Sequence, residues 1–306
     1  MAENPNIEVL MSTYNGEKYL SEQLDSILAQ KGCFNLKITV RDDGSSDGTH
    51  DILNYYVKEH GISVIYGKNI GVNASMMELV KQSGKDCDYF TFSDQDDVWY
   101  DFRLYEAVNS LNALNSTVPL LWSCMEELTD EKLKPFGLMP YPKKLGNFYN
   151  AMIQNKTAGH TQVFNQELRN LIVDYPAEKM YVYDWAIYLM ASAFGEVRFC
   201  ENSCGKYRQH GANAIGYELG WLRQTVRRIK RMTRGQFRNN SVQLEFFYGQ
   251  FKDKLCEDYR SEAERFLNSR KNIIKRVRFA FTTKIKRNTK VESLQFWALY
   301  ILGVFN

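Results

Sequence analysis

The stretch that most constrains the fold is the apolar run at residues 89–92, which is followed at once by Ser93-Asp94-Gln95-Asp96-Asp97. The aromatic and β-branched run predicts a short buried strand. Three carboxylates within four residues repel one another, so burying them requires a counter-cation. Asp94 and Asp96 point the same way if the strand continues, which suits a divalent ion with oxygen ligands. The alternative is an acidic, solvated turn.

Strands and helices alternate at short spacing around this stretch. We expect strands at 7–11, 37–40, 62–66, 88–92, 120–125 and 196–200, and helices at 17–30, 51–59, 74–82, 101–115 and 183–194. This alternation predicts an α/β fold, with a parallel sheet and helices on its faces.

Polar loops follow three of the expected strands, at residues 12–16, 41–49 and 93–99. In an open α/β sheet, the carboxyl ends of the strands form the edge where ligands bind, so these loops are expected to converge on one crevice. The chain has no G-x-G-x-x-G and no Walker A loop, which argues against a dehydrogenase or a P-loop kinase.

Charge is distributed unevenly along the chain, whose formal net charge is +3. Residues 217–306 hold 20 Lys and Arg against 8 Asp and Glu, whereas residues 1–216 are acidic. A basic C-terminal region is typical of contact with anionic lipid or nucleic acid, although it also fits a solvated helical face. Residues 221–232 and 272–281 are amphipathic and basic. The apolar residues 294–302 are too few to span a bilayer but could enter its interface.

The six cysteines show no C-x-x-C spacing, so we expect free thiols in a reducing compartment. The first residues are polar, and no apolar run reaches the roughly 18–20 residues of a spanning helix. We therefore expect a cytoplasmic protein that associates peripherally with the inner face of the cell membrane.

Five motifs occur in a recognisable order: Ser12-Thr13-Tyr14-Asn15, Asp42-Asp43-Gly44-Ser45-Ser46-Asp47, Asn69-Ile70-Gly71, Ser93-Asp94-Gln95-Asp96-Asp97 and Asp184-Trp185. Over residues 7–215 the chain resembles the family 2 glycosyltransferases, which are inverting enzymes with the GT-A fold. The resemblance implies a Rossmann-like, mostly parallel central sheet flanked by helices, with a C-terminal basic helical extension. Asp96-Asp97-Val98-Trp99 and the element at residues 207–213 resemble the rhamnosyltransferase branch, which builds bacterial surface polysaccharide.

The resemblance also implies a division of the chain. Residues 1–215 would form the GT-A domain, with a nucleotide-binding half at 1–100 and an acceptor-binding half at 101–215. Residues 216–306 would form the basic amphipathic tail.

By resemblance, the donor nucleotide would be bound by Ser12, Tyr14, Asn15, Asp42, Asp43, Lys68, Asn69, Asp94 and Arg208. Asp42 or Asp43 would accept the imide N–H of uracil or thymine, with Asp43 slightly favoured, and Asp94 would meet the ribose. Each position also has a structural alternative. Asp42 and Asp43 fit a plain turn, Lys68 and Asn69 fit a helix start, and Arg208 fits an ion pair.

Asp96 would bind Mn²⁺ or Mg²⁺, which neutralises the diphosphate leaving group. His210 would bind the metal or the diphosphate, or it has a structural role. Asp97 would assist the metal or cap the next helix.

Inversion requires one carboxylate to take the proton of the acceptor hydroxyl. By resemblance this general base is Asp184, whose alternative role is a helix N-cap. The acceptor would be bordered by Trp99, Asn155, His160 and Trp185.

The favoured function is therefore a metal-dependent inverting glycosyltransferase that moves L-rhamnose from dTDP-rhamnose to a lipid-linked saccharide. UDP-glucose, UDP-galactose and UDP-GlcNAc are alternative donors. A sugar nucleotidyltransferase is a more remote alternative, because such enzymes carry a Gly-rich loop with Arg and Lys after the first strand and this chain does not. A nucleic-acid-binding protein is equally remote, because no recognised nucleic-acid motif is present.

Overall fold

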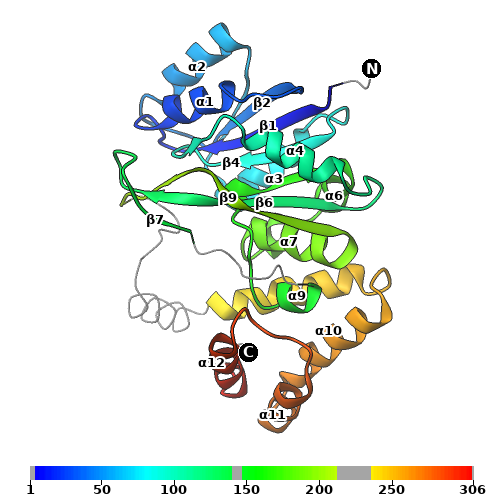
Figure 1. Cartoon of the computed structure of the whole chain (residues 1–306). Helices are drawn as coiled ribbons and strands as arrows, with labels where there is room; N and C mark the ends of the chain where they lie inside the picture. The colour runs from blue at the N-terminus through cyan, green and yellow to red at the C-terminus, as the bar shows by residue number, and fades with distance from the viewer. Residues whose placement is uncertain (1–3, 140–146, 212–235, 305–306) are drawn as a thin grey trace. The chain divides into compact units, whose positions relative to one another are not determined.

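The computed structural model describes residues 4–139, 147–211 and 236–304 (Figure 1). The amphipathic segment expected at 221–232 lies outside these residues. The chain forms two compact units. The first contains Met1–Tyr141, Thr157–Ala177 and Gly195–Tyr217, and the second contains Pro142–Lys156, Glu178–Phe194 and Glu218–Asn306. Both units are thus assembled from separate segments, and the division at residues 100 and 215 stays a prediction.

The first unit is built on one mixed sheet, in which the described strands run in the order β3-β2-β1-β4-β8-β6-β9-β5, with β7 pairing to β6. Strands β1 to β4 form a parallel sheet. Strand β8 is antiparallel to β4 and β6, whereas β9 is parallel to β6. The strands are β1 (Asn6–Thr13), β2 (Asn35–Asp42), β3 (Ser63–Tyr66), β4 (Tyr89–Ser93), β5 (Val98–Trp99), β6 (Leu120–Thr129), β7 (Pro135–Leu138), β8 (Val163–Asn165) and β9 (Glu196–Arg208).

Helices cover both faces of this sheet, as predicted. The alternate residues Ile7, Val9 and Met11 of β1 belong to one buried cluster with residues of α1, α2 and α4. On the opposite face, Ser12 Oγ lies 2.6 Å from Ser75 Oγ of α3, and the Arg169 guanidinium of α6 lies 5.8 Å from the Phe90 ring. The helices are α1 (Leu20–Leu28), α2 (Thr49–His60), α3 (Val72–Gln82), α4 (Arg103–Asn112), α6 (Gln166–Ile172) and the short 3₁₀ helix η1 (Gly159–Thr161).

Strand register brings the polar loops to one edge of the sheet. Thr13 pairs with Asp42, Asp42 pairs with Tyr66, and Met11 pairs with Ser93. Because these strands are parallel, their carboxyl ends lie together, and the loops that follow β1, β2 and β4 meet as expected.

The second unit is helical. Its core contains aromatic pairs such as Phe148 with Phe247 and Phe266 with Tyr300, whose ring centroids are 5.7 and 5.2 Å apart. The helices are α5 (Phe148–Ala151), α7 (Tyr183–Phe194), α9 (Gln236–Phe251), α10 (Glu257–Ser269), α11 (Ile273–Thr282) and α12 (Lys290–Ile301), and η2 (Ala177–Lys179) precedes α7. Among the described residues, no helix is both long enough and apolar enough to cross a membrane.

Candidate active site

One glutamine joins the loop after β1 to the acidic loop after β4. Gln95 Oε1 accepts hydrogen bonds from the Thr13 hydroxyl and from the Tyr14 N–H, the latter at 2.8 Å, and Gln95 Nε2 donates to the Tyr14 carbonyl at 3.1 Å. Asn15 has a left-handed backbone (φ 49°), and its N–H donates to Ser45 Oγ at 2.8 Å. The Tyr14 side chain is 48% exposed and available to a ligand.

The carboxylate of Asp43 is bonded within the protein. It forms a buried ion pair with Arg41, and it accepts the backbone N–H groups of Ile70 at 2.9 Å and Gly71 at 3.0 Å. The Arg41 guanidinium also donates to the Lys68 carbonyl at 3.1 Å. Asp43 therefore anchors the turn that holds the exposed residues Lys68 and Asn69.

Asp42 organises its own turn. Its carboxylate accepts hydrogen bonds from the N–H of Gly44, from both the N–H and hydroxyl of Ser45, and lies 2.8 Å from His50 Nε2. Gly44 has φ +84°, and a Cβ there would lie 3.1 Å from the backbone nitrogen of Asn69, so this turn requires glycine. Base recognition by Asp42 or Asp43 remains a prediction, and both have structural roles.

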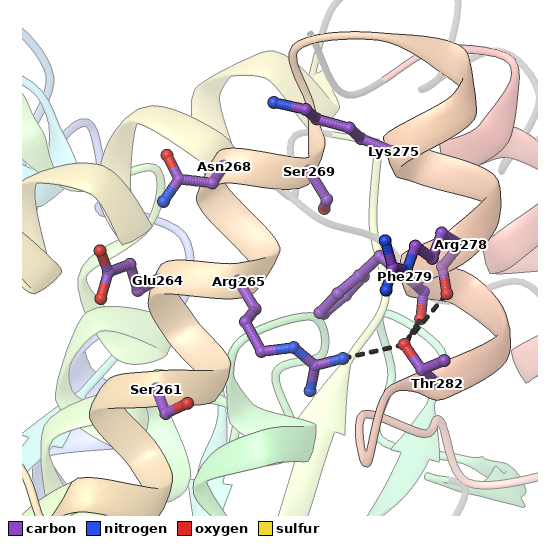
Figure 2. Close-up of a pocket in the computed structure, with 9 residues that line it drawn as sticks. All are labelled: Ser261, Glu264, Arg265, Asn268, Ser269, Lys275, Arg278, Phe279 and Thr282. Carbon is purple, nitrogen blue, oxygen red and sulfur yellow. Dashed lines mark hydrogen bonds between the residues drawn. The ribbon is translucent and has the colours of Figure 1, made fainter.

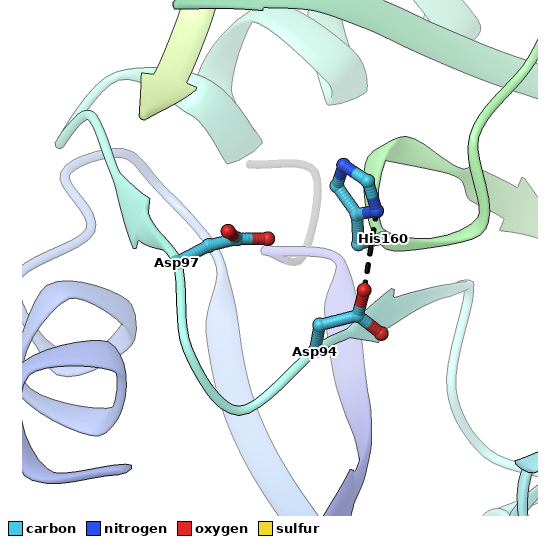
Figure 3. Close-up of side chains that lie close together, drawn as sticks. All are labelled: Asp94, Asp97 and His160. Carbon is cyan, nitrogen blue, oxygen red and sulfur yellow. Dashed lines mark ion pairs between the residues drawn. The ribbon is translucent and has the colours of Figure 1, made fainter. Parts of the chain in front are cut away.

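The acidic loop brings Asp94 and Asp97 to His160, which lies in η1 (Figure 3). One ligand atom from each side chain lies within 4.8 Å of the other two, and Asp94 Oδ2 is 3.3 Å from His160 Nδ1. From the sequence, Asp94 is predicted to meet the ribose and Asp97 to assist the metal or cap the next helix. His160 is predicted to border the acceptor. The structure places these three side chains together, and their individual roles stay predictions.

Asp97 is the most deeply buried of the three, at 1% exposure. Its Oδ1 accepts the Arg208 N–H at 3.0 Å, whereas its buried Oδ2 has no hydrogen-bond partner among the described residues. Burial raises the pKa of Asp97 well above the ordinary value. A buried carboxylate oxygen without a donor is unfavourable, so this oxygen fits a cation held together with Asp94 and His160.

Asp96 faces His210, with 2.7 Å between Asp96 Oδ2 and His210 Nε2. These are the two residues predicted to bind metal, and the structure brings them together. Burial raises the pKa of Asp96, and the charge of Asp94 adds to this effect, while His210 opposes it. Metal binding by this pair remains a prediction.

A buried chain of charges lies behind His160. His160 Nε2 is 2.6 Å from Glu126 Oε2, and Arg103 Nη1 is 3.1 Å from Glu126 Oε1. The Arg103 guanidinium also donates to the His160 carbonyl. Arg103 and Glu126 are fully buried. Sequence reasoning missed both residues, because charged side chains are usually on the surface and no local pattern marks these two as buried.

These contacts raise the pKa of His160 and lower the pKa of Glu126. Burial alone would lower the pKa of His160, but the charge of Glu126 and the hydrogen bonds that the imidazolium donates to Asp94 and Glu126 outweigh it, so the pKa is raised well above 6.5. Burial alone would raise the pKa of Glu126, but His160 and then Arg103 outweigh it, so that pKa is lowered. The imidazolium form of His160 is therefore favoured in the metal-free protein.

Arg208, predicted to bind the donor, is almost fully buried. Its guanidinium pairs with Glu22, donates to the Asp96 carbonyl at 2.8 Å and the Glu131 carbonyl at 2.6 Å, and lies 4.4 Å from the Tyr19 ring. It thus connects the acidic loop to α1. Tyr19 and Glu22 were not singled out from the sequence.

The predicted acceptor residues are divided between the units. Trp99 is 3% exposed in the core of the first unit, with the Arg103 guanidinium 4.1 Å from its ring, so burial gives it a packing role. Asn155, Asp184 and Trp185 belong to the second unit. Asp184 is half-buried in the first turn of α7, and Trp185 Nε1 donates to the Ala151 carbonyl at 2.7 Å.

The model of the family described as Glycosyl transferase family 2 matches residues 8–172, more than half of the chain. The chain belongs to this family. The match covers β1 to β4, the acidic loop and His160, which are the elements that build the candidate site. The chain is therefore a glycosyltransferase, as its motifs predicted.

Individual relatives agree with this assignment. Over 223 residues the glycosyltransferase is 26% identical to "dTDP-rhamnosyl transferase RfbG" of Shigella flexneri, covering 69% of this chain and 75% of the relative. In fold it is similar to S. aureus TarS 1-349 in complex with UDP-GlcNAc (TM-score 0.60, 16% identity, 97% of this chain and 81% of that chain). It is also similar to the mannosyltransferase PcManGT from Pyrobaculum calidifontis in complex with GDP-Man and Mn²⁺ (TM-score 0.54, 15% identity, 98% and 86%). The fold is GT-A, which confirms the predicted fold class.

Proposed function

We propose that this glycosyltransferase is a metal-dependent, inverting enzyme that uses a nucleotide-sugar donor. The observation that carries the proposal is the meeting of Asp94, Asp97 and His160, in which Asp97 Oδ2 is buried and no part of the chain that the structure describes gives it a hydrogen bond. Bound Mn²⁺ or Mg²⁺ would neutralise the diphosphate of the donor as it leaves. Asp94 and Asp97 would supply oxygen ligands for the ion, and Asp96, which lies between them on the acidic loop and faces His210, would complete its surroundings.

The residues at the ends of β1 and β2 are proposed to hold the nucleoside. Tyr14 presents an exposed ring that can stack on a base, beside Ser12 and Asn15. Asp42 and Asp43 fix the turns through their own hydrogen bonds, Lys68 and Asn69 lie on the turn that Asp43 fixes, and recognition of an imide N–H by Asp42 or Asp43 is part of the proposal. Arg208 supports this pocket through the backbone of the acidic loop.

Asp184 is proposed as the general base. Its place in the first turn of α7 favours the charged carboxylate, because the N-terminal end of a helix carries partial positive charge. The carboxylate would take the proton of the acceptor hydroxyl while that oxygen attacks the anomeric carbon and the nucleoside diphosphate leaves. Asn155 and Trp185 are the proposed acceptor residues on the same unit.

The similarity to "dTDP-rhamnosyl transferase RfbG" supports dTDP-rhamnose as the donor, with UDP-linked hexoses as the second candidates. We further propose a lipid-linked saccharide acceptor at the inner face of the cell membrane. The 20 Lys and Arg of residues 217–306 would attract an anionic membrane, with about 1 kcal/mol for each residue close to the surface. In this proposal residues 1–215 carry the chemistry and 216–306 the attachment.

A donor screen tests the activity. The purified chain is incubated with dTDP-rhamnose, UDP-glucose, UDP-galactose or UDP-GlcNAc, with Mn²⁺ or with EDTA, and release of the nucleoside diphosphate is measured. We expect release from dTDP-rhamnose only with the metal. Equal release in EDTA would overturn the metal dependence, and preference for a UDP-sugar would replace the donor.

A second experiment tests Asp184 as the general base. Asp184→Asn should bind donor with unchanged affinity but lose transfer to the acceptor by about 100-fold or more. Asp174→Asn, at an exposed position of the other unit, is the matched control and should retain full transfer. Transfer retained by Asp184→Asn would assign the base to another residue.

A further inference from the structure

The most exposed large apolar side chains of the described residues gather on two helices of the second unit. They are Phe281, Ile274, Leu294, Leu302 and Val291, in α11, in α12 or directly after it, and between 65 and 84% of each is exposed. Every other large apolar residue described is less exposed than these five. A surface of this kind is expected to contact a partner.

In α11 the apolar residues form one stripe that faces away from the protein. Ile273, Val277 and Phe281 follow a spacing of four residues, with Ile274 beside them, and all are exposed. The buried residue of this helix is Phe279, which is two positions from Val277 and so lies about 200° around the axis. Packing among residues 4–139, 147–211 and 236–304 therefore does not use the stripe.

Helix α12 repeats the arrangement. Val291 and Leu294, with Leu302 just beyond the end of the helix, lie on its exposed side, while Phe296 and Tyr300 are buried on the other. The two helices pack through their buried sides, where the Phe279 and Trp297 ring centroids are 5.8 Å apart and Arg276 Nε donates to the Ile301 carbonyl at 2.9 Å. Each helix thus keeps an apolar stripe exposed.

Basic side chains flank the stripe of α11. Residues 270–306 contain nine Lys and Arg and a single acidic residue, Glu292. Between α10 and α11 lies a cleft of about 570 Å³, lined by Arg265, Lys275 and Arg278, with Glu264 as its acidic residue (Figure 2). Both Lys275 and Arg278 are exposed; Arg278 lies next to the apolar stripe, four residues after Ile274, whereas Lys275 lies on the side of the helix that faces the cleft. The same helix therefore offers aliphatic and aromatic groups together with positive charge.

This combination favours one class of partner. A second copy of the chain would bring the same strongly positive segment against this one, and like charges repel. Nucleic acid is bound mainly through polar contacts to phosphate, which exposed Ile, Leu and Phe side chains do not provide. An anionic bilayer matches both parts, because its acyl region takes apolar side chains and its head groups attract Lys and Arg.

We infer that α11 and α12 form a docking surface for an anionic lipid bilayer, into whose interface Ile274, Phe281 and the apolar stripe of α12 insert while Lys275 and Arg278 contact lipid phosphate. This inference deepens the proposed function, since it names the residues through which a membrane-bound acceptor is approached. The helices are too short to span the bilayer and would lie in its plane.

Co-sedimentation of the full chain with vesicles tests the inference. One vesicle set contains phosphatidylcholine alone, and the other contains phosphatidylcholine mixed with phosphatidylglycerol. We expect binding to the mixed vesicles, at least about tenfold weaker binding by Ile274→Ser/Phe281→Ser, and about fivefold weaker binding for each charge removed in Lys275→Gln/Arg278→Gln. Tyr105→Ser/Leu138→Ser, which removes exposed apolar groups from the first unit, is the matched control and should bind like the unchanged chain.

Donor hydrolysis is measured on each variant, which separates this inference from the proposed function. Full hydrolysis with lost vesicle binding supports the docking surface. Unchanged vesicle binding by Ile274→Ser/Phe281→Ser overturns it. The inference would also be overturned if the unchanged chain did not bind vesicles but formed a dimer, and Ile274→Ser/Phe281→Ser dissociated that dimer. A second copy would then cover the stripe. Absence of hydrolysis in the unchanged chain contradicts the proposed function and leaves the vesicle result valid.

Discussion

His210 Nε2 lies 2.7 Å from Asp96 Oδ2 although the two residues are 114 positions apart in the sequence. His210 lies two residues after the end of β9, so the contact joins the end of that strand to the acidic loop after β4. Burial of Asp96 makes this partner important, because a carboxylate removed from water needs a donor or a cation.

The first prediction concerns Asp96 itself. Asp96→Ala should weaken Mn²⁺-dependent binding of a nucleoside diphosphate by about 10- to 100-fold, because it removes a carboxylate and leaves His210 without this partner. Titration calorimetry with dTDP, with and without Mn²⁺, measures the effect. Asp51→Ala, at an exposed position of α2, should bind as the unchanged protein does. Equal affinity in Asp96→Ala would remove Asp96 from the metal site.

The second prediction concerns Asp97, whose buried carboxyl group should lower the free energy of unfolding of the metal-free protein. Asp97→Asn keeps an oxygen that can accept the Arg208 N–H but removes a carboxyl group whose ionisation burial disfavours, so the metal-free variant should melt at a higher temperature. A gain of 1 kcal/mol corresponds to roughly 2–4 °C in a domain of about 150–250 residues. The same variant should lose most of the stabilisation that Mn²⁺ gives the unchanged protein. A lower melting temperature without metal would contradict this account.

Glu126 should position His160. Glu126→Gln leaves Arg103 and the imidazolium without their buried anion, and such losses destabilise proteins by about 3–5 kcal/mol. Because the ring would no longer be fixed through Nε2, Mn²⁺ affinity should also fall, by about 10- to 100-fold.

The neighbouring Glu127 provides a matched control for this prediction. It accepts the Tyr100 hydroxyl at 2.7 Å and does not touch His160 in any contact described. Glu127→Gln should change neither urea denaturation strongly nor Mn²⁺ binding measured by electron paramagnetic resonance. If both variants bound Mn²⁺ equally well, Glu126 would have only a stabilising role.

The pH dependence of stability follows from His160. Its pKa is raised in the folded protein, so its contribution is fully present below 6.5 and is lost as the pH rises through the folded value. The pKa of Glu126 is lowered, so its contribution is present above 4.5 and is lost as the pH falls through its folded value. We therefore expect His160→Gln to be less stable than the unchanged protein, with the largest difference at pH 4.5 to 6.5. Urea denaturation in EDTA at a series of pH values measures this difference. A difference that grew above 6.5 would contradict the favoured imidazolium form.

Much of the fold follows from sequence pattern, because alternation of apolar strands and amphipathic helices is a local property. The helix at residues 183–194 begins and ends as predicted, and the acidic loop follows β4 as predicted. The strand expected at 196–200 extends to Arg208, because β9 pairs with both β6 and β5. Pairing between distant strands of that kind leaves no local pattern.

The candidate site was predictable in its carboxylates but not in its partners. Asp94, Asp96 and Asp97 stand out because they follow an apolar run. Arg103 and Glu126 do not, because charged residues in a sequence are usually on the surface. Their burial depends on the fold, which places three charged groups from α4, β6 and η1 in one cluster.

Gln95 has a consequence for how the enzyme meets its donor. Its amide holds the Thr13 hydroxyl and the Tyr14 backbone while its own backbone lies between Asp94 and Asp96. The backbone of Tyr14, whose ring is proposed to stack on the base, and the acidic loop that carries the proposed cation ligands are thus tied to each other before any sugar nucleotide arrives. Binding of a donor would therefore cost little conformational entropy in these two loops. The affinity would depend on how well the distance between the base and the diphosphate of the donor matches the spacing of the loops.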